Sequence, residues 1–172
     1  GGSSNPFVSA FKDGKQGVSF EVSIYVDQPG TGGDRDPYEG NGITTDVDVG
    51  HTFIKLKKVN DDSSVVQRTF GFYPSTGVNP IIGPVNVKGA FIDDNGHHYE
   101  VSNSKSVSET EFEAILQYIE KKSSNNYDLN TYNCTDFAIE AAAAGGFSVP
   151  ETHGSWPGGG GANPGDLGED IR

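Results

Sequence analysis

The stretch 127–146, YDLNTYNCTDFAIEAAAAGG, places the single cysteine of the 172-residue chain at the predicted start of a helix. Asn133 or Thr131 can cap this helix, alanines propagate it, and the closing glycine pair can end it. Backbone N–H groups and the helix dipole favour negative charge at a helix start, so the pKa of the Cys134 thiol should fall. Cys134 is therefore a candidate nucleophile. The alternative is a small buried residue that begins a core helix.

The chain is strongly acidic, with 12 basic and 24 acidic residues and a formal net charge of −12. This charge opposes binding to nucleic acid and to anionic lipid. We expect no membrane span, because no apolar run approaches the roughly 20 residues that a spanning helix needs. The opening GGSSNPF is typical of the segment after a removed export signal or lipid-anchor cysteine, and favours a periplasmic or cell-surface location. The sequence leaves the oligomeric state open.

Alternating apolar residues and turn signals predict a mostly antiparallel sheet in the first two thirds of the chain. The expected strands cover 18–26, 44–59, 65–73, 85–94 and 97–107. The second and third strands should form a hairpin. Asn95 and Gly96 favour a type I′ turn between the last two.

Ser108 and Glu111 form a predicted capping box ahead of an amphipathic helix that ends near Lys122. Its apolar face should comprise Phe112, Ile115, Leu116 and Ile119. The fold class is therefore α+β, an antiparallel sheet packed on the cysteine-bearing helix and this second helix. We expect a flexible N-terminal segment at 1–17, the domain at 18–147, and an extended Gly/Pro-rich tail at 148–172 that packs on the domain.

His51, in the strand sequence VGHTFIKL, is the histidine that most needs an explanation. His97 and His98 follow a turn and His153 lies in the glycine-rich tail, so these three are expected to be exposed. A cysteine nucleophile needs a neighbouring base, and histidine is the usual one. The alternative for His51 is a packing residue whose polar atoms are satisfied.

The motifs GHTFI on a strand and YNCTDFA at a helix start resemble the permuted NlpC/P60 branch of the papain-like proteins, in which the histidine precedes the cysteine. This group includes cell-wall peptidases, amidases and enzymes that transfer lipid acyl groups. The resemblance implies a papain-like fold, Cys134 as the nucleophile of a thioester mechanism and His51 as the general base.

Sites of this family commonly have a third polar residue that orients the histidine, on the strand paired with the histidine strand. Here that strand offers Gln67, Thr69 and Tyr73 and no histidine or carboxylate. Tyr73 is opposite His51 if the hairpin turns near Asp62, and Thr69 is the second choice.

The backbone N–H of Cys134 should contribute to the oxyanion hole, with Asn133 or Tyr132 as further candidates. Trp156, in the tail, is a candidate substrate contact. Asp136 suits stabilisation of the first helical turn better than catalysis.

The sequence favours a cysteine hydrolase that cleaves a peptide or amide, with a cell-wall crosspeptide as the preferred substrate. The alternatives are a non-catalytic binding module with a degenerate site and a lipid or ester acyltransferase.

We expect no cofactor and no metal. The acidic loop 28–42 does not match the EF-hand spacing, although calcium binding there stays open. Asp46 and Asp48 share one strand face and His51 lies on the other, so a metal site at these three residues would need the strand to bulge.

Overall fold

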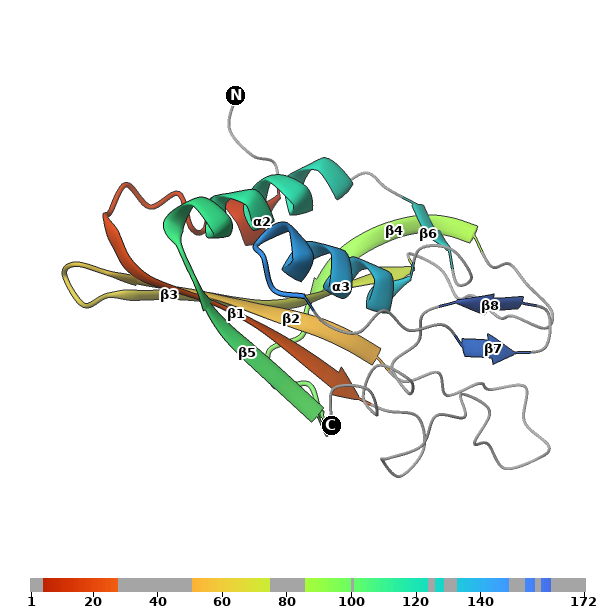
Figure 1. The fold of residues 1–172 in the computed structure, drawn as a ribbon. Coiled ribbons are helices and arrows are strands. Elements are labelled where there is room, and N and C mark those ends of the chain that lie inside the picture. The colour runs from red at the N-terminus through yellow and green to blue at the C-terminus, as the bar shows by residue number, and fades with distance from the viewer. Residues whose placement is uncertain are drawn as a thin grey trace.

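The fold is α+β in the computed structural model, which describes residues 5–27, 51–74, 86–99, 101–123, 126–128, 133–148, 154–156 and 159–161. Within these residues a sheet has the order β5-β1-β2-β3-β4-β6, and all neighbouring strands are antiparallel. Helices α2 and α3 lie on one face of this sheet (Figure 1). The strands are β1 (Gly17–Asp27), β2 (His51–Asn60), β3 (Val65–Pro74), β4 (Asn86–Asp93), β5 (Val101–Val107) and β6 (Asn126–Asp128), and the helices are α1 (Pro6–Ser9), α2 (Glu109–Lys122) and α3 (Cys134–Ala144).

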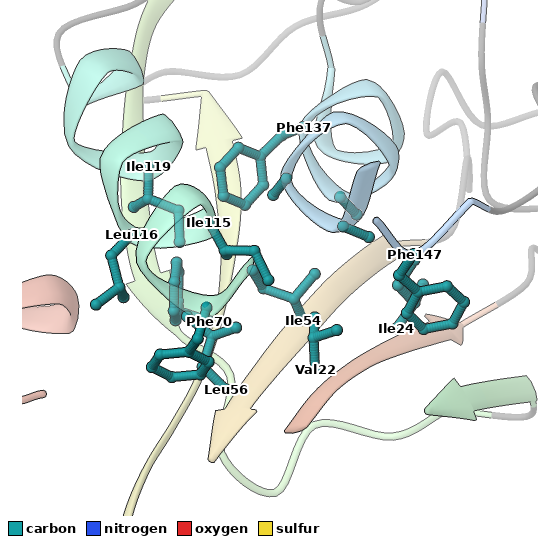
Figure 2. Packing of buried hydrophobic residues seen from close by; sticks show 14 of the residues in the cluster. Val22, Ile24, Ile54, Leu56, Phe70, Ile115, Leu116, Ile119, Phe137 and Phe147 are labelled. Atoms are coloured by element: carbon teal, nitrogen blue, oxygen red, sulfur yellow. The ribbon is translucent and has the colours of Figure 1, made fainter. Parts of the chain in front are cut away.

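The core lies between the sheet and the two long helices (Figure 2). Because strand side chains alternate between faces, the even-numbered residues of β1, β2 and β3 point toward the helices. The predicted apolar face of α2 is confirmed, because all four of its residues are buried. The predicted capping box of Ser108 and Glu111 is also present. The core side chains from the strands include Val22, Ile24, Ile54, Leu56, Phe70 and Phe72, and α3 contributes Phe137.

The predicted hairpin between the fourth and fifth strands is wrong. A turn does form, with Gly96 at φ +86° and the His97 N–H donating to the Asp94 carbonyl over 2.8 Å. However, β4 pairs with β3 and β6, whereas β5 pairs with β1. The chain therefore crosses the sheet after the turn. His97 packs on Phe53 and Tyr99 packs on Tyr25, and these ring contacts hold the crossing on the face opposite α2 and α3.

The described residues of the N-terminal segment, 5–17, include a helix and pack on the core, which differs from the flexible segment expected over 1–17. Asn5 caps α1, and Phe11 is 4% exposed against the core. The buried Lys58 ammonium donates to Asp13 over 2.7 Å and fixes the loop before β1. This ion pair offsets the free-energy cost of burying the Lys58 ammonium, which would be large if the ammonium had no partner.

The tail contains a small antiparallel pair, β7 (Gly154–Trp156) with β8 (Gly159–Gly161). The other tail residues after Ser148 lie outside the described residues, as do 44–50 of the predicted second strand. Among the described helices, none has the length and apolar character needed to cross a membrane.

Candidate active site

Cys134 is the first residue of α3, and the local sequence explains why the helix begins there. The Asn133 side chain accepts hydrogen bonds from the N–H groups of Thr135 at 3.0 Å and Asp136 at 3.2 Å. Asp136 in turn accepts from the Asn133 N–H over 2.9 Å, which completes a capping box. The helix start is thus fixed from both sides, and the thiol sits at its positive end.

This capping box occupies the backbone N–H of Asn133, which was predicted as a further oxyanion-hole candidate. This N–H donates to the Asp136 carboxylate. The N–H of Cys134 stays the better candidate, because an N–H in the first helical turn has no intrahelical acceptor. Tyr132 lies outside the described residues, and for Trp156 only the backbone in β7 is described.

Replacing Asn133 with alanine should lower the free energy of unfolding by about 1 kcal/mol, the usual cost of losing a helix N-cap. Urea unfolding followed by circular dichroism measures this change. Asn103→Ala, on the exposed strand β5, is the control and should change the free energy of unfolding by less than about 0.5 kcal/mol. Equal losses in both variants would contradict the capping role.

His51, the first residue of β2, forms a buried hydrogen-bonded pair with Asp94, just after β4. The distance from Nε2 to Asp94 Oδ2 is 3.0 Å, and the two residues are 8% and 4% exposed. Tyr73 donates its hydroxyl hydrogen to the other oxygen, Oδ1, and its ring stacks on His51 with centroids 4.2 Å apart. Both oxygens of the Asp94 carboxylate therefore have hydrogen-bond partners. The His51 imidazole is fixed by a hydrogen bond at Nε2 and by the packing of Tyr73 on one face of its ring.

Asp94 takes the orienting position for which Tyr73 and Thr69 were predicted. The paired strand β3 contains no carboxylate, as expected, and Asp94 reaches His51 from the end of β4. Tyr73 acts on His51 through Asp94 and through ring stacking. Thr69 lies opposite Lys55 in the β2–β3 pairing, and its carbonyl accepts the Asp94 N–H over 2.9 Å. The signal missed in the sequence was the second acid of FIDDNG, Asp94, which ends a predicted strand immediately before the Asn95-Gly96 turn.

Gly71 leaves the space in which His51 and Asp94 meet. A Cβ at this position would lie 2.6 Å from His51 Nε2 and 2.6 Å from Asp94 Oδ2. Real Cβ atoms essentially never come this close to another heavy atom. The absence of a side chain at Gly71 on β3 is therefore needed for His51 and Asp94 to form their pair.

The electrostatics of the site favour a charged thiolate–imidazolium pair. Burial opposes the charge on His51, but the neighbouring Cys134 sulfur and Asp94 outweigh it and raise the pKa of His51 to about 9. Burial likewise opposes the thiolate, but the His51 charge and its hydrogen bond to the sulfur lower the pKa of Cys134 overall. Because Asp94 occupies Nε2, Nδ1 is the ring nitrogen left for the thiol. The imidazolium of His51 and the thiolate of Cys134 each stabilise the charged form of the other, because opposite charges attract.

Thr52 joins β2 to the start of α3 through two contacts. Its hydroxyl lies 2.9 Å from the Thr135 hydroxyl, and both residues are fully buried. Its backbone N–H also forms a hydrogen bond with the Cys134 sulfur, which contributes to the lowered thiol pKa. Strand and helix are thus held in the register that brings His51 to Cys134.

His97 also lies beside the site, although the sequence predicted it to be an exposed turn residue. Its ring centroid is 5.3 Å from that of His51 and 5.2 Å from that of Phe53. The described residues contain no group of three or more His, Cys, Asp or Glu side chains placed to hold a metal ion. The chemistry of this arrangement is that of a thiol with an oriented base.

Comparisons of the chain with protein-family models, with curated proteins and with solved structures found no match.

Proposed function

We propose that the protein is a cysteine hydrolase that cleaves an amide bond of a peptide substrate through Cys134, with His51 as the acid–base and Asp94 as its orienting residue. The observation that carries the proposal is the buried series of thiol, imidazole and carboxylate, in which the pKa of the thiol is lowered and that of the imidazole is raised to about 9. Perturbed and mutually oriented groups of this kind are typical of functional sites.

In the proposed reaction the Cys134 thiolate attacks the carbonyl carbon, and a C–S bond forms as the carbonyl oxygen becomes an oxyanion. The His51 imidazolium gives its proton to the leaving nitrogen as the C–N bond breaks, which releases an amine and leaves a thioester. A water molecule then attacks the thioester while His51 takes one of its protons. Finally the C–S bond breaks, the acid is released and the thiolate–imidazolium pair is restored.

The fold that we propose is the papain-like, permuted NlpC/P60 arrangement suggested by GHTFI and YNCTDFA. An antiparallel sheet with a cysteine helix on one face and the histidine on strand β2 supports it. A cell-wall crosspeptide is the substrate class that we propose to test first, because the net charge of −12 disfavours an anionic lipid surface.

The thiol–imidazole pair is tested by the rate of iodoacetamide labelling of Cys134 against pH. In the wild type the labelling rate should titrate well below the ordinary thiol pKa of about 8.5, because His51 stabilises the thiolate. In His51→Ala the midpoint should rise to about 8.5 or above, since burial then acts without a compensating charge. His98→Ala, which alters an exposed histidine, is the control and should behave as the wild type. Midpoints near 8.5 in the wild type and in His51→Ala would overturn the proposal.

One observation favours a second function, a non-catalytic binding module: Cys134 is only 4% exposed. A thiol that labels in the unfolded protein but not in the folded protein supports this second function. Hydrolysis of peptidoglycan fragments that is lost in Cys134→Ser supports the hydrolase.

A further inference from the structure

A hollow of about 310 Å³ lies on the sheet face opposite α2 and α3. Its floor comes from odd-numbered residues of β1, β2 and β3, which point away from the helices, and its roof comes from the crossing segment, residues 94–99. The volume is at the lower end of the range for sites that bind small molecules.

The walls of the hollow are largely aromatic. The rings of Tyr25 and Phe53 are stacked with centroids 5.2 Å apart, and Tyr99 meets Tyr25 edge-on at 4.6 Å. His97 lies 5.2 Å from Phe53 and completes the wall on the crossing segment. Phe53 is only 2% exposed, so Tyr25, Tyr99 and His97 are the rings that offer contact to an aromatic or other planar apolar group.

Lys55 is the one lysine or arginine among the described lining residues of the hollow. Lys55 Nζ lies 5.7 Å from the Tyr25 ring centroid, and the half-exposed Lys55 lines the hollow beside the neutral side chains of Gln67, Thr69 and Asn95. Among the described lining residues the only acid is Asp94, whose side chain is 3% exposed and whose oxygens are engaged by His51 and Tyr73. An entering carboxylate would therefore meet several neutral polar groups and the Lys55 ammonium, which also has a hydrogen bond with the Tyr25 side chain.

We propose that this hollow is a binding site for a small carboxylate that carries an aromatic or similarly flat apolar group. The aromatic walls would take the flat group, and Lys55 would pair with the carboxylate. The hollow adjoins the candidate active site, because Asp94 lines it and is also paired with His51, but the proposed ligand would contact Lys55 and the aromatic walls and not Cys134. Binding therefore goes beyond the proposed hydrolase and does not depend on it.

The test uses the full chain as Cys134→Ser, so that hydrolysis cannot interfere, and N-acetyl-L-phenylalanine as the probe. Isothermal titration calorimetry gives Kd, and NMR of the Tyr99 and His97 rings reports the place of binding. The matched ligand is N-acetyl-L-phenylalanine amide, which has the same ring but no carboxylate. The matched variants are Lys55→Gln and Lys57→Gln. Lys57 lies two residues further along the same strand face and does not line the hollow.

The acid should bind and shift the Tyr99 and His97 resonances, whereas the amide and the Lys55→Gln variant should each raise Kd about tenfold or more, the usual effect of losing a charge-assisted hydrogen bond. Lys57→Gln should change Kd less than threefold. Equal affinity for acid and amide, equal losses in the two lysine variants, or no shift at Tyr99 and His97 would each overturn the proposal. A tetrapeptide ending in phenylalanine then separates two sources of the same chemistry: retained affinity indicates a peptide C-terminus, and lost affinity indicates a free small acid.

Discussion

Asp94→Asn should lower kcat/KM for peptide hydrolysis by about 2- to 10-fold at pH 8 and move the alkaline limb of the pH profile to lower pH. The pKa of His51 is about 9, and Asp94 is one of the groups that raise it. The rate falls as pH rises through this pKa, because a neutral imidazole cannot protonate the leaving group. An amide lacks the negative charge that stabilises the imidazolium, so the limb should appear about one to two units lower, and each unit corresponds to a tenfold change.

Asp93→Asn is the matched control for this experiment. Asp93 neighbours Asp94 in sequence but is exposed, and its carboxylate accepts the Asn95 N–H in the turn. This variant should keep the alkaline limb near pH 9. The assigned role of Asp94 fails if its variant keeps the wild-type limb, or if both variants move it equally.

Gly71→Ala should reduce kcat/KM by on the order of 100-fold and lower the free energy of unfolding by about 1–3 kcal/mol. The new methyl group would lie 2.6 Å from both His51 Nε2 and Asp94 Oδ2, so one of these groups must move. The backbone itself is not the obstacle, because Gly71 is not among the described glycines with positive φ. Activity against pH, iodoacetamide labelling and urea unfolding together measure the effect.

Gly17→Ala separates loss of stability from loss of the site. A Cβ at Gly17 would lie 2.5 Å from Phe20 Cζ and 2.9 Å from Lys58 Cε, so the crowding is comparable, but these neighbours are residues of β1 and β2 outside the His51–Asp94 pair. This control should lose stability while the thiol pKa of Cys134 is unchanged. If the Gly71 variant also keeps the wild-type thiol pKa, Gly71 has no part in building the His51–Asp94 pair.

Much of the fold could be predicted because local patterns and burial agree. The period-two strands and the face of α2 have one buried side each, and Ser108 and Asn133 are side chains that cap helices well. The exception in β1 is Val18, which has the same even-numbered spacing as the buried residues of this strand but is 62% exposed. The register of β1 against β2 shifts between Gly17 and Ser19, and period-two alternation does not carry across such an irregularity.

The site could be predicted only in part, because its members meet through long-range pairing. Cys134 and His51 could be proposed from local context, a helix start and a polar ring within a strand. Asp94 is brought to His51 by the pairing of β3 with β4, and the turn at Gly96 is equally compatible with a simple hairpin. The role of Gly71 in this site could not be predicted from the sequence, because an absent side chain adds no hydrophobic or polar pattern.

Strand β2 connects correct folding to reactivity. Successive residues of a strand point to opposite faces, so Thr52 bonds Thr135 toward α3 while His51 meets Asp94. A slip of β2 by one residue would exchange these two faces, expose the core residues of the strand and separate the imidazole from both of its partners. A molecule with this slip would therefore lose its core packing and its His51–Asp94 pair at the same time.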